Sequence, residues 1–214
     1  MIPRMAYPVA LSVVPQIANR NRLTTVFRLI LALPHILLVG GVMGELWSAS
    51  SHSIVSIGGS TGVLGAIVFL LSIVSWLTIV LSGEHVQGIR EITMLVLRWR
   101  ARAIAYTMLF VDEYPPFGDG PYPVTLTVVD PPADRRNRLT VGLRMLLVIP
   151  QAIVLFFVLC FWWVLTIIAW FAILLTGRYP EGLARLAVGA MRWELRVEAY
   201  LLLLVDEYPP FSFE

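Results

Sequence analysis

The chain has 214 residues, of which 58% are hydrophobic and only 14% are charged. Ordinary soluble domains are about half apolar and carry about a quarter charged residues, so the composition favours an integral membrane protein. A net charge of +2, with basic residues interleaved with acidic ones, argues against a nucleic-acid partner. The single cysteine, Cys160, excludes an intramolecular disulfide and a CxxC metal site.

The sequence is a tandem duplication. YPVALSVV at residues 7–14 returns as YPVTLTVV at 122–129, and VDEYPPF occurs at both 111–117 and 205–211. NRLT at 21–24 recurs 116 positions later and the tail recurs 94 positions later, so the first copy has 22 additional central residues. We therefore predict two domains, a first repeat over residues 1–118 and a second over residues 119–214.

Each repeat is expected to open with a short strand. The YPV segments alternate β-forming residues between two faces, while the prolines of DEYPPF keep the residues before them extended. We expect each opening strand to pair with the closing segment of one of the copies, directly beneath the membrane.

Long apolar stretches follow the strands. No residue from 46 to 83 or from 145 to 176 is charged, and each stretch exceeds the roughly 20 residues that cross a bilayer. In the first copy, residues 23–47 and 63–82 predict a helical hairpin with a Gly/Ser-rich connection. In the second copy, residues 139–176 predict a tighter hairpin that turns near residues 157–162, because a single pass would put the two tails on opposite sides of the membrane.

Charge placement orients these hairpins. Every arginine then falls on the side that holds both termini, which the positive-inside rule assigns to the cytoplasm. Residues 1–22 lack a signal-peptide pattern. We predict an α-helical integral membrane protein whose four transmembrane helices form two tandemly repeated hairpins, with interfacial helices and short cytoplasmic β-strands. An approximate two-fold axis along the membrane normal would relate the hairpins.

The interfacial helices are expected at residues 88–110 and 182–204. In the second one, Arg185, Arg192 and Arg196 share one stripe, and Glu194 and Glu198 lie nearly opposite. We expect the arginines to face headgroup phosphates or the acidic tail, and the glutamates to face water.

The segment from residue 170 to 214 resembles a bacterial membrane-protein family known as domain of unknown function 4389. In that family a YPV strand, two hydrophobic helices, a TGRYPEG turn and a DEYPPF tail occur together. Here TGRYPEG spans residues 176–182, and Gly177 and a proline suit a helix end and a new helix start. The resemblance implies membrane location and repeat organisation, but no activity. We expect a multi-pass protein of the bacterial cytoplasmic (inner) membrane with both termini in the cytoplasm.

The first copy resembles the family more weakly, because SGEHVQGI replaces TGRYPEGL at residues 82–89. A function that needs Arg178, Tyr179 or Glu181 would therefore operate only in the second copy.

The paired carboxylates of the tails are the candidates for acid–base chemistry. Adjacent residues of an extended segment point to opposite faces, so we interpret the tail as structural, with one carboxylate paired to an arginine of its own copy. The tail residues are Asp112, Glu113, Tyr114, Asp206, Glu207 and Tyr208.

Arginines are the candidates for contacts with lipids or a partner protein. Arg28 and Arg144 occupy equivalent positions just inside the apolar segments, where they can reach the phosphate layer. His35, whose counterpart in the second copy is Gln151, is expected to pack and hydrogen-bond rather than to bind metal. The full set of candidates is Arg28, Arg98, Arg102, Arg144, Arg178, Arg192 and Arg196.

No catalytic, cofactor-binding or metal-binding motif is recognisable in the chain. We therefore expect a non-enzymatic accessory or scaffolding subunit of a membrane complex, without a cofactor. Its partners would be membrane lipids and a membrane protein or a second copy of the chain. Two alternatives stay open: a lipid-binding or small-solute transport protein and, less favoured, a lipid-headgroup enzyme that uses the tail carboxylates or Arg178 and Glu181.

Overall fold

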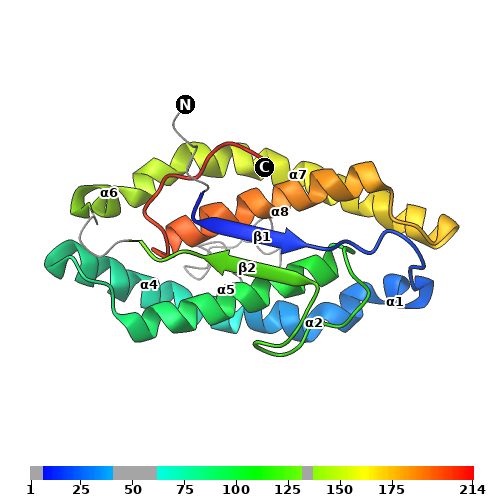
Figure 1. The fold of residues 1–214 in the computed structure, drawn as a ribbon, viewed down its shortest axis with the longest axis horizontal. Helices are drawn as coiled ribbons and strands as arrows, with labels where there is room; N and C mark the ends of the chain where they lie inside the picture. The colour runs from blue at the N-terminus through cyan, green and yellow to red at the C-terminus, as the bar shows by residue number, and fades with distance from the viewer. Residues whose placement is uncertain (1–6, 41–61, 132–136) are drawn as a thin grey trace, which may run out of the picture.

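The computed structural model describes residues 7–40, 62–131 and 137–214. In both repeats a strand is followed by a short helix, apolar helical residues, a second long helix and the DEYPPF tail (Figure 1). The first repeat contains β1 (Val9–Val13), α1 (Arg22–Val26), α2 (Arg28–Val39), α4 (Val63–Ser82) and α5 (Gln87–Thr107). The second contains β2 (Val124–Val128), α6 (Arg138–Gly142), α7 (Arg144–Thr176) and α8 (Glu181–Leu201).

Helix α7 runs without a break for 33 residues, so the tight hairpin predicted near residues 157–162 is wrong. In the first repeat, α2 and α4 follow one another in the same direction along the molecule instead of folding back (Figure 1). Their ends meet, because a Cβ on Gly62 would clash with the backbone nitrogen of Gly40. The additional residues of the first copy therefore interrupt a helix that is continuous in the second. The predicted connection at residues 48–62 lies outside the described residues, apart from Gly62.

The reversal of direction comes instead at the TGRYPEG turn. Helix α7 ends at Gly177, which has φ +70° and donates its N–H to the carbonyl of Ile173 at 2.8 Å. Pro180 then precedes the first residue of α8, as the sequence predicted. Gly83, with φ +86°, ends α4 in the same way. The two antiparallel partners in each repeat are thus the apolar helix and the charged helix that follows it, which brings both tails back without a turn inside the apolar stretch.

The two opening strands pair with each other, not with the closing segments as predicted. They are antiparallel, and their register joins Val9 to Val128, Leu11 to Leu126 and Val13 to Val124. Leu11 and Leu126 are equivalent residues of the duplication, so the register is symmetric about this pair. An approximate two-fold axis therefore crosses the sheet at the pair and relates the two repeats.

Each repeat packs its strand and its short helix against long helices of the other repeat. Strand β1 packs on α8 of the second repeat and β2 packs on α5 of the first, while α1 packs on α7 and α6 packs on α4. The inner strand residues Val9, Leu11, Val124 and Leu126 are buried, and Ala10, Ser12, Thr125 and Thr127 on the outer side are exposed. Each repeat thus depends on the other for its core.

Helices α4 and α7 are long and apolar enough to cross a membrane. Only 28% and 33% of the residues in their most apolar stretches are buried inside the molecule. A core helix of a soluble protein would be mostly buried, so these two helices indicate association with a membrane.

Both charged helices end on a leucine in the left-handed conformation. Leu109 after α5 has φ 66° and Leu203 after α8 has φ 63°, a region that a leucine rarely adopts. Both side chains are buried, and their packing offsets the backbone cost. Because the same turn recurs in both repeats, it sets the direction in which each tail leaves its helix.

Candidate functional site

Each repeat builds the same buried anchor at the start of its apolar helix. In the second repeat, the Arg144 guanidinium donates to the carbonyl oxygens of Tyr200 (2.7 Å) and Val205 (3.0 Å) and to the Asp206 carboxylate (2.9 Å). It also lies 4.4 Å from the centre of the Tyr200 ring, within cation–π range. Arg144 is only 2% exposed, so its charge interacts with groups inside the protein.

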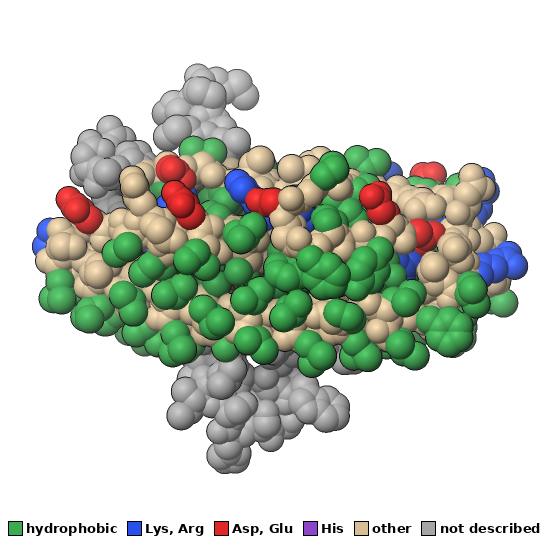
Figure 2. Space-filling view, turned by 90° about the horizontal axis from the view of Figure 1, so that it is seen from below, with side chains coloured by type: hydrophobic (Ala, Val, Ile, Leu, Met, Phe, Trp, Pro, Cys, Tyr) green, Lys and Arg blue, Asp and Glu red, His purple; other side chains and the backbone are tan. Residues whose placement is uncertain are grey.

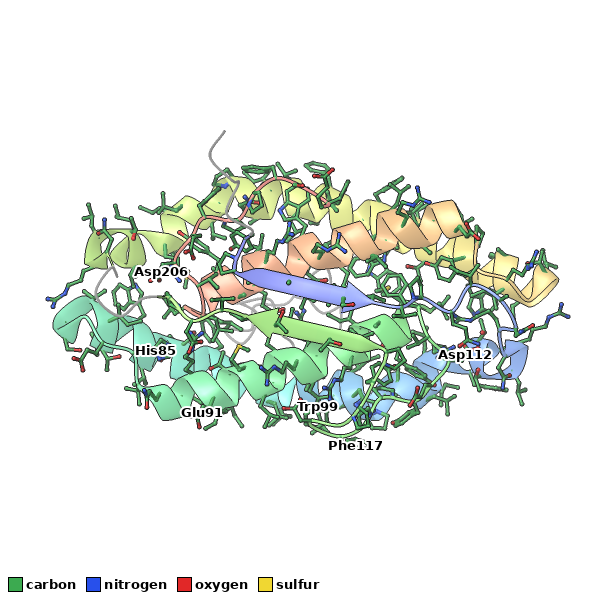
Figure 3. The ribbon with its side chains drawn as sticks, in the orientation of Figure 1. His85, Glu91, Trp99, Asp112, Phe117 and Asp206 are labelled. Atoms are coloured by element: carbon green, nitrogen blue, oxygen red, sulfur yellow. The ribbon has the colours of Figure 1, made fainter. Side chains whose placement is uncertain are left out.

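The first repeat reproduces this anchor. Arg28 pairs with Asp112, donates to the Val111 carbonyl at 3.0 Å and lies 4.1 Å from the centre of the Tyr106 ring. Arg20 adds a second contact to Asp112 at 2.8 Å. As the sequence predicted, each tail aspartate pairs with an arginine of its own copy. Figure 3 shows Asp112 and Asp206 near opposite ends of the two-stranded sheet, as the two-fold axis requires.

The other tail residues connect the two repeats. Glu113 and Glu207 are exposed, and their backbone carbonyls accept hydrogen bonds from the hydroxyls of Tyr122 (2.9 Å) and Tyr7 (3.1 Å), which belong to the opposite repeat. Burial raises the pKa of both tyrosine hydroxyls well above the usual range, so both stay protonated donors. The neighbouring Tyr114 and Tyr208 are each 41% exposed.

Two predicted arginines of α5 contact the linker between the repeats. Arg102 is buried, donates to the Gly118 carbonyl at 2.7 Å and lies 3.2 Å from the Asp119 carboxylate. Arg98 is half-buried and lies 3.7 Å from the same carboxylate.

The equivalent arginines of α8 face the chain ends. Arg192 donates to the Phe213 carbonyl at 2.8 Å. Arg196 is buried with its guanidinium 5.5 Å from the centre of the Tyr7 ring. Of the seven predicted arginines, Arg178 is exposed, at the turn between α7 and α8, and is therefore the one best placed to meet lipid or a partner.

Helix ends are capped across the repeats. Arg22 of the first repeat donates to the Leu175 carbonyl at the end of α7 (3.3 Å), and Arg138 of the second donates to the Ser82 carbonyl at the end of α4 (2.9 Å). A cation at a helix C-terminus is favourable because the last carbonyls are unpaired and the helix dipole is negative there. These reciprocal caps hold the two outer helices in register.

Indole groups make a second reciprocal pair. Trp76 of α4 donates to the Val141 carbonyl of α6, and Trp170 of α7 donates to the Thr25 carbonyl of α1, both at 3.0 Å. The equivalence of Trp76 and Trp170 in the sequence is therefore a consequence of the interlock.

His35 and Gln151 also have equivalent partners. The Trp99 indole donates to His35 Nδ1 at 2.9 Å, and the Trp193 indole donates to Gln151 Oε1 at 2.8 Å. The His35 ring stacks on Phe117 with the ring centres 4.5 Å apart, beside Trp99 (Figure 3). His35 thus packs and hydrogen-bonds as predicted. Within residues 7–40, 62–131 and 137–214, no group of three His, Cys, Asp or Glu side chains could hold a metal ion.

A further group of buried charges forms a cluster that the sequence did not predict. Arg100 of α5 lies 3.3 Å from Glu194 and also contacts Glu198, both on α8. The three residues are between 1% and 4% exposed, so the prediction that the two glutamates face water is wrong. Burial raises the pKa of Glu198 to about 7 and also raises that of Glu194, although Arg100 opposes both shifts.

A signal for this cluster was present in the duplication. Arg100 and Glu194 are equivalent residues, 94 positions apart, with opposite charges. The two-fold axis brings them together, and identical residues there would bury like charges against each other. Divergence of the two copies at this position thus supplies an ion pair across the axis.

Two apolar grooves lie at equivalent places between the repeats. One has a volume of about 220 Å³ and the other of about 300 Å³. Equivalent residues line them: Ser72, Trp76, Arg144 and Leu203 in the first, and Thr166, Trp170, Arg28 and Leu109 in the second. Both grooves are almost wholly apolar, so they suit hydrocarbon better than a polar substrate.

Comparison with known proteins identifies the repeat. A family model described as "Domain of unknown function (DUF4389)" matches twice, at residues 54–118 and 138–212, which is consistent with the tandem duplication. No curated protein and no solved structure shows significant similarity to the chain. Because the two matches cover more than half of the chain, the protein belongs to the DUF4389 family.

Proposed function

We propose that this protein is a non-catalytic membrane module, an accessory or scaffolding subunit of a membrane complex. The observation that carries this proposal is the use of its charged groups. Asp112 and Asp206 are held by buried arginines, and Glu194 and Glu198 are held by Arg100. The carboxylates best suited to acid–base catalysis thus stabilise the fold, and each repeat contains one of the two equivalent aspartate anchors.

Residence in a membrane is supported by the outer helices. Leu146, Phe157 and Leu175 of α7 are 64%, 67% and 77% exposed, and they belong to an apolar surface that continues along the whole helix. Monomeric soluble proteins rarely expose such continuous apolar surface. We place this surface in the inner membrane of a bacterium, with the sheet on the cytoplasmic side.

The sheet offers a surface for a partner protein. Its outward side chains are the small residues Ala10, Ser12, Thr125 and Thr127, which leave a flat surface with little side-chain entropy to lose on binding. Both tails run beside it and expose acidic side chains. A partner with a flat, basic complementary surface would fit here.

Native mass spectrometry after gentle extraction from the source membrane tests this proposal. We expect a protein partner in fixed stoichiometry. The variant Ser12→Arg, or the equivalent Thr127→Arg, adds bulk and charge to the outer face of the sheet. Either change should remove the partner without changing the amount of the chain. Replacing Glu84 by glutamine is the matched control, at an exposed site in the turn between α4 and α5. Extraction of the chain without a partner, in the native and variant forms alike, would contradict the proposal.

Binding of membrane lipid is a second candidate function, favoured by the two grooves. Each groove is lined by apolar side chains and one arginine, and the two-fold axis relates the two grooves. In the same mass spectra, this function predicts two retained lipids per chain. Replacing Thr166 by tryptophan, which fills one groove, should remove one of them.

A further inference from the structure

Exposed side chains divide the molecule into two opposite faces. Figure 2 shows acidic and basic side chains along the upper edge, on the side of the sheet, whereas hydrophobic side chains cover the middle and the lower edge. The apolar face belongs to the outer helices α2, α4 and α7 and the short helices α1 and α6. Among the described residues of α7, Arg144 is the only charged one, and it is buried.

Exposed charges occur along the full length of the polar face. Asp130 lies near the start of α5 through its contact with Arg90, and its side chain is 80% exposed. Asp119, with a side chain 46% exposed, contacts the middle of α5 through Arg98. Glu113 follows Asp112 near the opposite end of the sheet from Asp206 (Figure 3). If the long axis crossed a bilayer, some of these carboxylates would lie in the hydrocarbon core, which is costly.

The dimensions of helix α7 also argue against a long axis that crosses the bilayer. Helix α7 has 33 residues and is therefore about 50 Å long, well beyond a hydrocarbon core of about 30 Å. Its width of about 10 Å fits within a single leaflet, about half of that core. The exposed Arg22, Arg138 and Arg178 stand at the ends of the outer helices, where lipid phosphates would meet them.

We propose that the protein lies flat in one leaflet of the bilayer. Helices α2, α4 and α7 lie parallel to the membrane plane with their apolar face among the acyl chains, and the sheet faces water. The two-fold axis through Leu11 and Leu126 then follows the membrane normal. The apolar face is thus covered by the lipids of one leaflet, and the long apolar helices do not cross the bilayer. This proposal rests on the membrane residence proposed above.

Depth measurements on single-cysteine variants test the orientation. Leu146, Phe157 and Leu175 are separated by about three and about five whole turns of α7 and so share one stripe. The equivalent residues of the first repeat, Ile30, Val63 and Leu81, are exposed to 63%, 62% and 68%. In a background with Cys160 replaced by serine, each is changed to cysteine and labelled with an environment-sensitive fluorophore. Ser12, changed to cysteine, reports the sheet.

The labelled variants are reconstituted in vesicles of phosphatidylcholine and phosphatidylglycerol that contain spin-labelled lipids with the quencher at a shallow or a deep acyl position. We expect the same quenching ratio at all three positions of α7 and at their three equivalents, and access of a water-soluble quencher to Ser12→Cys alone. If the label at position 157 is deep while those at 146 and 175 lie at opposite headgroup layers, about 44 Å apart along the helix, α7 crosses the bilayer. That result overturns the flat orientation and leaves membrane residence intact. If water reaches all seven sites, membrane residence itself fails.

Discussion

Exchanging the charges of Arg100 and Glu194 tests the two-fold relation between the repeats. Arg100→Glu places three carboxylates in one buried cluster, and Glu194→Arg places two guanidinium groups there beside Glu198. Arg100 and Glu194 are 1% and 2% exposed, and removal of one partner of a buried ion pair costs about 3–5 kcal/mol. Typical domains have a net stability of about 5–15 kcal/mol, so each single variant should lose a large part of it.

The double variant Arg100→Glu/Glu194→Arg should behave differently. The axis exchanges positions 100 and 194, so the ion pair forms again with its charges reversed. An arginine at position 194 also lies one turn from Glu198 on α8, within reach of an intrahelical pair. We expect the double variant to be no less stable than either single variant, which corresponds to a coupling of about 3 kcal/mol.

Denaturant unfolding in detergent micelles, followed by tryptophan fluorescence, measures these free energies. Arg185→Glu, an exposed change on the same helix, serves as the control and should alter stability by less than about 0.5 kcal/mol. The reasoning is refuted if Arg100→Glu is as stable as the control, or if the free-energy losses of the two single variants simply add in the double variant.

Three further results are expected. Burial raises the pKa of Glu198 from 4.5 to about 7, so the folded state binds this proton more tightly than the unfolded state. The stability that this proton contributes is full below pH 4.5 and is lost as the pH rises through 7. Glu198→Gln should flatten this part of the dependence in melts between pH 5 and 8, and an unchanged slope would refute it. Arg144→Met should cost about 3–5 kcal/mol, because the carbonyls of Tyr200 and Val205 and the Asp206 carboxylate lose the Arg144 guanidinium. Arg28→Met should cost less, because Arg20 still pairs with Asp112. Arg178→Met, at an exposed arginine, should cost less than about 0.5 kcal/mol, and a loss as large as that of Arg144→Met would count against the anchors. Fragments 1–118 and 119–214 should co-purify when expressed together, since β1 pairs with β2; a fragment that folds alone would contradict the interlock.

Local chemistry and the duplication predicted part of this fold. The glycine and proline of TGRYPEG ended α7 and preceded α8 as expected, because their backbone preferences need no tertiary context. Pairing of one tail carboxylate with an arginine of its own copy was also predicted, since extended neighbours such as Asp112 and Glu113 point to different sides. The structure shows that the aspartate is the one that pairs.

The wrong predictions about the helices share one cause. A span rule converts apolar length into crossings of a bilayer, so residues 139–176 suggested two passes, whereas α7 is a single helix that runs along the molecule. The same assumption placed α8 at a membrane surface and turned Glu194 toward water. In the structure the sheet covers that helix, and Arg100 from the other repeat pairs with the glutamate. Periodicity within one helix does not reveal such a partner, although the opposite charges at equivalent positions 100 and 194 did offer a signal.

Polarised infrared spectroscopy of the protein in oriented bilayers tests the central claim most directly, because the dichroism of the amide I band reports the average direction of the helix axes. The long helices α4, α5, α7 and α8 lie nearly along one axis of the molecule (Figure 1), so they contribute together. The flat orientation predicts a dichroism of helices that lie in the plane of the membrane. Helix axes along the membrane normal would contradict it.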